Sequence, residues 1–124
     1  MQNSLGKRFW LIPDCYWPEV TGEGHYVSHE SICVLNTGDV DVSVKITLYF
    51  EDREPIEGFL AKCGARRTHH IRMDKLVEAS GNPVPKGVPY AALVESSLPV
   101  VVQYSRIDTT QPNETLATTI AFAV

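Results

Sequence analysis

The sequence lacks the features that would place it in a membrane or on a disulfide or zinc scaffold. Its 3 cysteines, Cys15, Cys33 and Cys63, are an odd number and include no Cys-x-x-Cys pair. The longest apolar runs, such as residues 98–102, fall far short of the roughly 20 residues that a membrane-spanning helix needs. Residues 1–8 are polar and contain no apolar signal core. We therefore expect a cytoplasmic protein with reduced thiols and no membrane insertion.

Positive charge is also scarce. Lys and Arg total 11 against 15 Asp and Glu, which leaves a net charge of −4 and no overall positive field to attract a phosphate backbone. Nucleic-acid binding is therefore disfavoured, although a local basic patch could still act. Hydrophobic residues make up 44% of the 124 residues and charged residues 21%, as in globular domains. A chain of this size predicts one domain over residues 1–124 with its own core.

Residues 42–50 give the clearest local pattern. Val42, Val44, Ile46, Leu48 and Phe50 alternate with mostly polar residues, which predicts a half-buried strand. The turn-forming residues 36–39 separate it from another run of strand formers at 26–35. The two runs together predict a hairpin.

Further short strands are expected along the rest of the chain, and no helix is long enough to cross over a parallel sheet. The segment 74–79 predicts at most one helical turn, with Asp74 as its N-cap. The pattern therefore predicts an all-β fold, an antiparallel sandwich or barrel with about eight strands. The expected strands, besides the hairpin, are residues 8–12, 58–62, 67–73, 90–95, 99–107 and 116–123.

Three polar clusters interrupt strand-like segments, at residues 28–31, 66–72 and 103–108. A strand interior holds polar side chains only when they are solvated, paired or functional. In the second cluster, a period of two places Arg66, Thr68, His70 and Arg72 on one face. Such a face can hold an anion or another polar ligand, because arginine forks grip carboxylates, phosphates and diols.

Other chemistry is less well supported by these residues. His29, Glu30, His69 and His70 are of the ligand types that zinc and iron prefer, but adjacent histidines on a strand point to opposite faces. Solvated or hydrogen-bonded histidines are therefore favoured, and no cofactor or metal is expected. No nucleophile elbow or phosphate loop occurs, and Cys33 within its apolar run is typical of an inert core thiol. We expect no enzyme, with a metal-assisted hydrolase or isomerase as the catalytic alternative.

The same clusters resemble the family of soluble sensory rhodopsin transducers. The matching blocks are residues 28–39, 65–72, 101–108 and 118–121, and several separated blocks at matching spacing are more specific than one motif. The resemblance implies a β-sandwich of jelly-roll type assembled as a homotetramer. It also implies a signalling domain that binds a small molecule, such as a sugar or related metabolite. DNA binding has been suggested for the rhodopsin-linked member.

The resemblance also implies a set of ligand-binding positions, which coincide with the three polar clusters. Our leading hypothesis is that five of them converge at one end or on one face of the sandwich and hold a small polar ligand, namely His29, Glu30, Arg67, His70 and Arg106. The alternative is a protein–protein or DNA-binding transducer that acts downstream of a membrane receptor, in which the clusters are structural networks. The positions are Ser28, His29, Glu30, Arg66, Arg67, Thr68, His70, Arg72, Gln103, Arg106 and Asp108.

The C-terminal strand expected at residues 116–123 bears on assembly. It carries few charges to protect an exposed sheet edge. A tetramer would cover such an edge, so the sequence is compatible with the oligomer that the resemblance implies.

Overall fold

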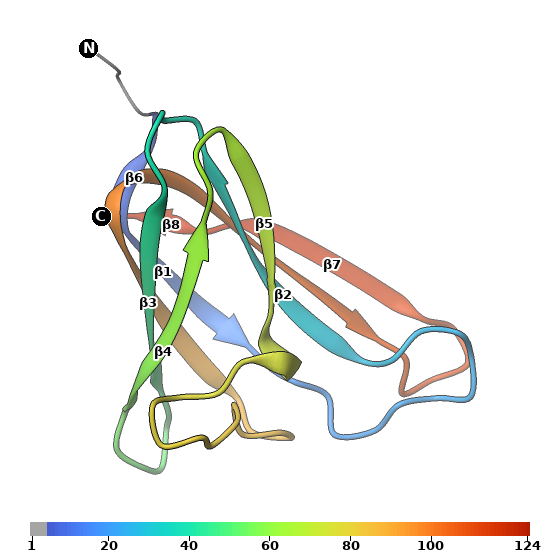
Figure 1. Cartoon of the computed structure of the whole chain (residues 1–124). Helices are drawn as coiled ribbons and strands as arrows, with labels where there is room; N and C mark the ends of the chain where they lie inside the picture. Colours follow the sequence, from blue (N-terminus) through green and yellow to red (C-terminus); the bar gives the residue numbers. More distant parts are fainter. Residues whose placement is uncertain (1–4) are drawn as a thin grey trace.

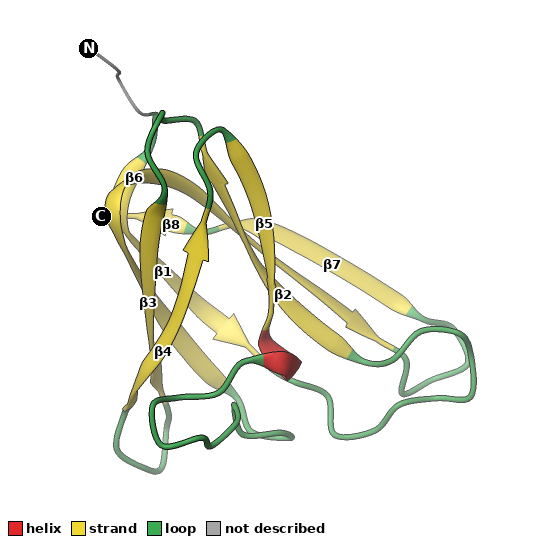
Figure 2. Ribbon diagram, viewed as in Figure 1, coloured by secondary structure: helices red, strands yellow, loops and turns green. Residues whose placement is uncertain are grey.

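The computed structural model describes residues 5–124, so residues 1–4 of the polar start lie outside the described residues. The chain is an all-β antiparallel structure with a single short 3-10 helix among its described residues, as Figures 1 and 2 show, and this confirms the predicted fold class. No helix in this part of the chain is long and apolar enough to cross a membrane. The elements are β1 (Lys7–Cys15), β2 (His29–Asn36), β3 (Val42–Tyr49), β4 (Ile56–Cys63), β5 (Arg67–Arg72), η1 (Met73–Lys75), β6 (Tyr90–Asp108), β7 (Thr115–Ile120) and β8 (Phe122–Ala123).

The strands form two layers that share β6. Sheet A has the order β4-β3-β6-β1-β8, and sheet B consists of β5, β2, β6 and β7 in that order. The first half of β6 pairs with β1 and β3, and its second half pairs with β2 and β7. In Figure 1 the long β6 ribbon can be followed from one layer into the other.

The continuity of β6 corrects the prediction of separate strands at residues 90–95 and 99–107. β6 is one strand of 19 residues. Its register has partners up to Ser96, opposite Val44, and resumes at Val100, opposite Lys7. Pro99 has no N–H for a ladder, so pairing is interrupted there while the strand continues. Residues 97–99 thus form a corner at which the strand changes sheets.

The predicted hairpin between residues 26–35 and 42–50 is also wrong. β2 belongs to sheet B and β3 to sheet A, so the connection crosses between the layers. The buried Asn36 side chain explains why. Its amide donates to the carbonyls of Val40 at 2.9 Å, Gly64 at 3.1 Å and Cys63 at 3.3 Å, and its oxygen accepts from the Gly38 N–H at 3.0 Å. These bonds satisfy the crossing backbone without a ladder.

The core lies between the two sheets. The predicted alternation of β3 is confirmed, because Val42, Val44, Ile46 and Leu48 are all buried. Sheet B contributes inward-facing residues such as Ile32. Burying each aliphatic side chain of this size contributes about 1.5–3 kcal/mol.

The predicted helical turn at residues 74–79 is replaced by η1, which starts one residue earlier. Its N-cap position is Arg72, which makes no side-chain capping bond, so Asp74 is not the cap. The turn stops at Leu76 because the backbone becomes extended there, and Val77 then forms a β-bridge with Pro83.

Candidate functional site

The outer face of sheet B carries five of the predicted residues, which are His29, Thr68, His70, Arg72 and Gln103. The register aligns Cys33 with both His70 and Gln103. Directly opposed residues share a face of the sheet. Alternate residues such as Ile32 and Ile71 are buried on the opposite side. We call this outer surface the polar face. It carries the apolar residues Leu35, Val101 and Ile107 among a larger set, which is His29, Ser31, Cys33, Thr68, His70, Arg72, Gln103 and Ser105.

A shallow hollow of about 210 Å³ lies in the middle of the polar face. Thr68, His70 and Gln103 contribute polar groups to its lining, and Val101 and Ile120 contribute apolar ones. Within residues 5–124, the His70 ring makes no hydrogen bond and is exposed. Such a ring is free to bond a ligand.

One end of the polar face carries a tight ion pair. Arg72 grips Asp74 through two bonds, Nε to Oδ1 and Nη2 to Oδ2, both at 2.8 Å. Burial by itself raises the pKa of Asp74, but the Arg72 bonds and charge, with a smaller contribution from His29, hold that pKa below its usual range. His29 Nδ1 lies 2.8 Å from the Val27 carbonyl, which can only accept, so Nδ1 donates in this bond and the ring is oriented by it.

Glu30 faces the interior instead, because it follows His29 on the same strand. Its side chain is fully buried, and its carboxylate accepts hydrogen bonds from the hydroxyls of Tyr90 and Tyr104. The backbone N–H of Tyr16 donates a third bond at 2.8 Å. Burial raises the pKa of Glu30, although the two tyrosines, the Tyr16 N–H and the charge of Arg106 oppose the shift.

Arg66 and Arg67 lie at the far end of the β2–β5 pair. Arg67 pairs with Asn36 at the end of β2, whereas His29 begins that strand. At about 3.3 Å per residue, the two ends are separated by roughly 20 Å. Arg66 has a positive φ of 54° and forms an exposed ion pair of 3.4 Å with Asp39. The single convergent cluster of our leading hypothesis is therefore not formed.

Ser28 and Thr109 fasten the loop of residues 16–28 to the end of β6, and Figure 1 shows this loop beside the β6–β7 connection. The buried Ser28 hydroxyl donates to the Val20 carbonyl at 2.8 Å and accepts from the Thr109 N–H at 2.9 Å.

Asp108 next to this site accepts from Thr110, which lowers the pKa of its carboxyl. Half-buried Arg106 stands opposite Glu30 in the register.

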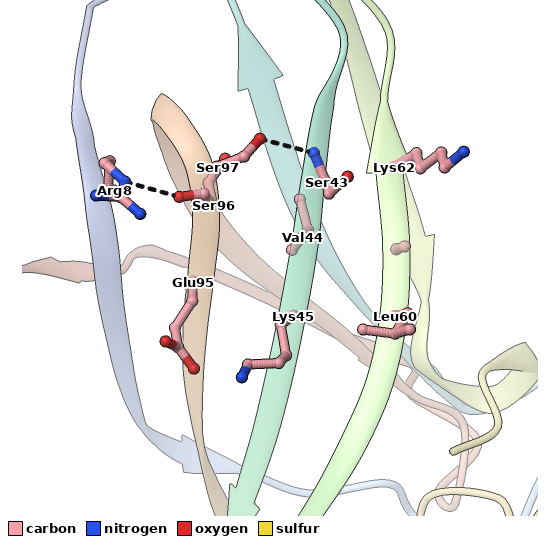
Figure 3. Close-up of a pocket in the computed structure, with 10 residues that line it drawn as sticks. Arg8, Ser43, Val44, Lys45, Leu60, Lys62, Glu95, Ser96 and Ser97 are labelled. Carbon is pink, nitrogen blue, oxygen red and sulfur yellow. Dashed lines mark hydrogen bonds between the residues drawn. The ribbon is translucent and has the colours of Figure 1, made fainter. Parts of the chain in front are cut away.

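Sequence reasoning missed a groove of about 360 Å³ on the outer face of sheet A, which Figure 3 shows. The alternation at residues 42–50 does place Ser43 and Lys45 on an outer face. No local signal indicates that β1, β4 and β6 complete the hollow, because their pairing is tertiary. The groove is lined by Arg8, Ser43, Val44, Lys45, Leu60, Ala61, Lys62, Glu95, Ser96 and Ser97.

The metal and nucleophile hypotheses gain no support from this geometry. Among residues 5–124, no group of three or more His, Cys, Asp or Glu side chains could hold a metal ion. Cys15, Cys33 and Cys63 are free thiols. Burial raises the pKa of all three, which disfavours the reactive thiolate.

These features define a small antiparallel β-sandwich domain with a polar outer face on one sheet and a buried carboxylate–tyrosine network behind it. The sequence model of the Anabaena sensory rhodopsin transducer family matches residues 5–123. The chain belongs to this family, which confirms the resemblance seen in its sequence. It is a signalling transducer domain by that membership.

Solved structures agree with this assignment. A protein of Thermotoga maritima, named Thermotoga maritima 1070, is 39% identical with a TM-score of 0.83, and 96% of each chain is covered. The Anabaena sensory rhodopsin transducer is 36% identical with a TM-score of 0.74, over 86% of this chain and 92% of that one. A comparison with curated proteins gives no match.

Proposed function

We propose that this chain is a non-enzymatic transducer domain that binds a small polar ligand, such as a sugar or related metabolite, on the polar face. Ligand binding would change its contacts with a protein partner, a receptor or regulator. The observation that carries the proposal is the grouping of Thr68, His70 and Gln103 around one hollow. A hydroxyl, an imidazole and an amide together offer the donors and acceptors that ligand hydroxyls need.

Two further predicted residues on the same face, outside the lining of the hollow, would contact a ligand that extends toward the start of β2. Arg72 is held by Asp74, and His29 is oriented by its bond to Val27. Held in this way, these side chains lose little additional freedom on binding. Val101 and Ile120 give the apolar floor on which the C–H surface of a sugar or metabolite can pack.

The remaining predicted residues would act through the scaffold. Glu30 and Ser28 are buried and fully engaged in hydrogen bonds. They would hold the strands and the entry loop in place behind the ligand. Arg66, Arg67 and Asp108 stand at the ends of the strands that carry the hollow, where they would meet a partner. Arg106 stands opposite Glu30 and would act on the Glu30 network through its charge.

Assembly as a homotetramer in the cytoplasm is part of the proposal. β7 lies at the edge of sheet B, and all 6 of its residues are exposed. The strand contains no charged side chain to discourage edge pairing. A neighbouring subunit that covers β7 would remove this liability.

The alternative function is a transducer that acts through protein or DNA contacts alone, with the polar clusters structural. The observation that favours it is the internal pairing of Glu30 with its tyrosines, Arg72 with Asp74 and Arg66 with Asp39. Such pairing satisfies these groups without a ligand.

A thermal-shift screen against sugars, nucleotides and organic acids tests the proposal, because a ligand that binds only the folded state raises the melting temperature. We expect a ligand whose shift is lost in His70→Ala and in Gln103→Ala. It should be kept in His25→Ala, an exposed loop histidine that serves as the matched control. If no ligand shifts the native chain, or if the shift survives in both polar-face variants, the alternative is favoured.

A further inference from the structure

We propose that the groove on the outer face of sheet A is a second binding site, which takes a small hydroxycarboxylic acid. The site uses none of the residues of the polar face, so it goes beyond the function proposed above. The groove exists because Val44 stands opposite both Ser96 and Ala61, and this row points its side chains inward. The outward side of the row presents backbone only.

Two rows of outward side chains form the walls, and Figure 3 shows both. On one side, Ser43 stands opposite Lys62, and the Ser43 N–H donates to Ser97 Oγ at 2.9 Å. On the other side, Lys45 stands opposite Glu95 and Leu60. Rows two residues apart along a strand are separated by about 7 Å, so a single carbon chain can lie between them.

Arg8 closes the β1 end of the groove with an oriented cation. Its Nε donates to the Ser96 carbonyl at 3.0 Å, which fixes the plane of the guanidinium. Among the described residues, its two terminal nitrogens make no hydrogen bond and Arg8 forms no ion pair. A guanidinium held in this way presents a ready fork for a carboxylate.

The net charge of the lining also selects an acid. The lining includes three basic residues, Arg8, Lys45 and Lys62, and a single acidic one, Glu95, on a chain whose overall charge is −4. Lys45 and Glu95, which carry opposite formal charges, stand opposite one another in the register, and in Figure 3 Lys62 points away from the groove. Arg8 is thus the cation left to bind a ligand anion.

The other lining residues suit the hydroxyl groups and the carbon chain of the proposed ligand. The hydroxyls of Ser43 and Ser97 line the wall at a distance from Arg8. Ser97 Oγ accepts one bond but keeps its own proton to donate, and both serines can pair with ligand hydroxyls. Exposed Leu60 gives apolar surface for the carbon chain.

The test is an NMR titration of the isotope-labelled full chain with gluconate at low ionic strength. Sorbitol, which lacks the carboxylate, and butyrate, which lacks hydroxyls, are the reference compounds. We expect saturable shifts of the Lys45, Leu60, Lys62 and Glu95 amides with gluconate, and at least tenfold weaker responses to both references. Arg8→Gln should weaken gluconate binding by about tenfold, the effect of losing one charge-assisted contact.

Two variants separate binding from a general effect of charge or folding. Arg53→Gln removes an exposed arginine in the loop between β3 and β4 and should leave the affinity unchanged. Glu95→Gln removes the one carboxylate of the groove and should tighten binding about two- to threefold, which a merely damaged fold would not do. The proposal is overturned by unsaturable shifts, by sorbitol or butyrate binding equally well, by equal weakening in Arg8→Gln and Arg53→Gln, or by weaker binding in Glu95→Gln. The His70→Ala variant should keep gluconate binding, because His70 belongs to the polar face and not to the groove. This result distinguishes a test of the groove from a test of the polar face.

Discussion

Replacing Glu30 with alanine should strongly destabilise the domain. The carboxylate accepts hydrogen bonds from Tyr90, Tyr104 and the Tyr16 N–H, and both tyrosine side chains are buried. Without Glu30, both tyrosine hydroxyls lose their acceptor, and the Tyr16 N–H keeps only its 3.2 Å bond to the Tyr104 hydroxyl. An unsatisfied buried donor costs about 1–3 kcal/mol. The relief from burying a charge offsets part of this cost, so we expect a net loss of about 2–4 kcal/mol.

Urea unfolding followed by tryptophan fluorescence measures this loss. A domain of this size has a total unfolding free energy of about 5–15 kcal/mol, so the change is large. The melting temperature should fall by roughly 10 °C. Glu30→Gln should cost less, because the carboxamide oxygen still accepts while a tyrosine hydroxyl can rotate to accept from the amide. A Glu30→Ala variant within about 0.5 kcal/mol of the native chain, the range of neutral surface changes, would refute the network.

The pH dependence gives the same reasoning a second test. Burial raises the pKa of Glu30 in the folded state, so the folded chain holds this proton more tightly than the unfolded chain. The Glu30 contribution to stability must therefore fall as pH rises from the ordinary glutamate pKa to the raised one. Glu30→Gln should lack this decline. Suppose instead that the unfolding free energy of the native chain, relative to that of Glu30→Gln, rises with pH over that window. The pKa of Glu30 is then lowered in the folded state, and our account of its burial fails.

The other predictions concern the backbone, an ion pair and the sheet edge. Gly6→Ala should cost more unfolding free energy than Gly81→Ala, since both have positive φ but only a Cβ at Gly6 would collide with a carbonyl of β6; equal urea midpoints would contradict this. Arg72→Ala should cost about 1 kcal/mol at pH 7 and raise the pKa of Asp74. The native chain should then lose the stability from this pair as pH falls, and the variant should not; an unchanged Asp74 titration by NMR would count against the pair. Removing residues 118–124 deletes β8 and half of β7 and should give aggregated or unfolded protein; a monodisperse folded truncation on size exclusion would disprove this.

Local pattern was enough to locate the extended segments but not to predict where strands continue, break or join, since residues 90–108 form one strand and the segment expected at 116–123 is divided between β7 and β8. The alternation at residues 42–50 reflects a half-buried strand, and β3 forms there as expected. The turn residues 36–39 look the same whether they close a hairpin or cross between layers. The choice depends on Asn36, which bonds to carbonyls as far away as Gly64. The corner in β6 depends in the same way on pairing with strands distant in sequence.

The candidate site shows the same boundary between local and tertiary information. The period of two in β5 correctly placed Thr68 and His70 together, since only strand geometry was needed. The same period separates His29 from Glu30, and strand length separates His29 from Arg67. The groove on sheet A combines residues from β1, β3, β4 and β6, so it could not be predicted before the sheet order was known.

The central claim is that the polar face binds a small polar ligand. The most direct measurement is amide chemical-shift mapping of the labelled chain with the compound that gives the largest thermal shift. We predict saturable changes at β2, β5 and the second half of β6, around His70 and Gln103, and their loss in His70→Ala. Saturable changes confined to other parts of the chain, or no saturable change with any compound of the screen, would contradict the claim and favour a transducer that acts through macromolecular contacts alone.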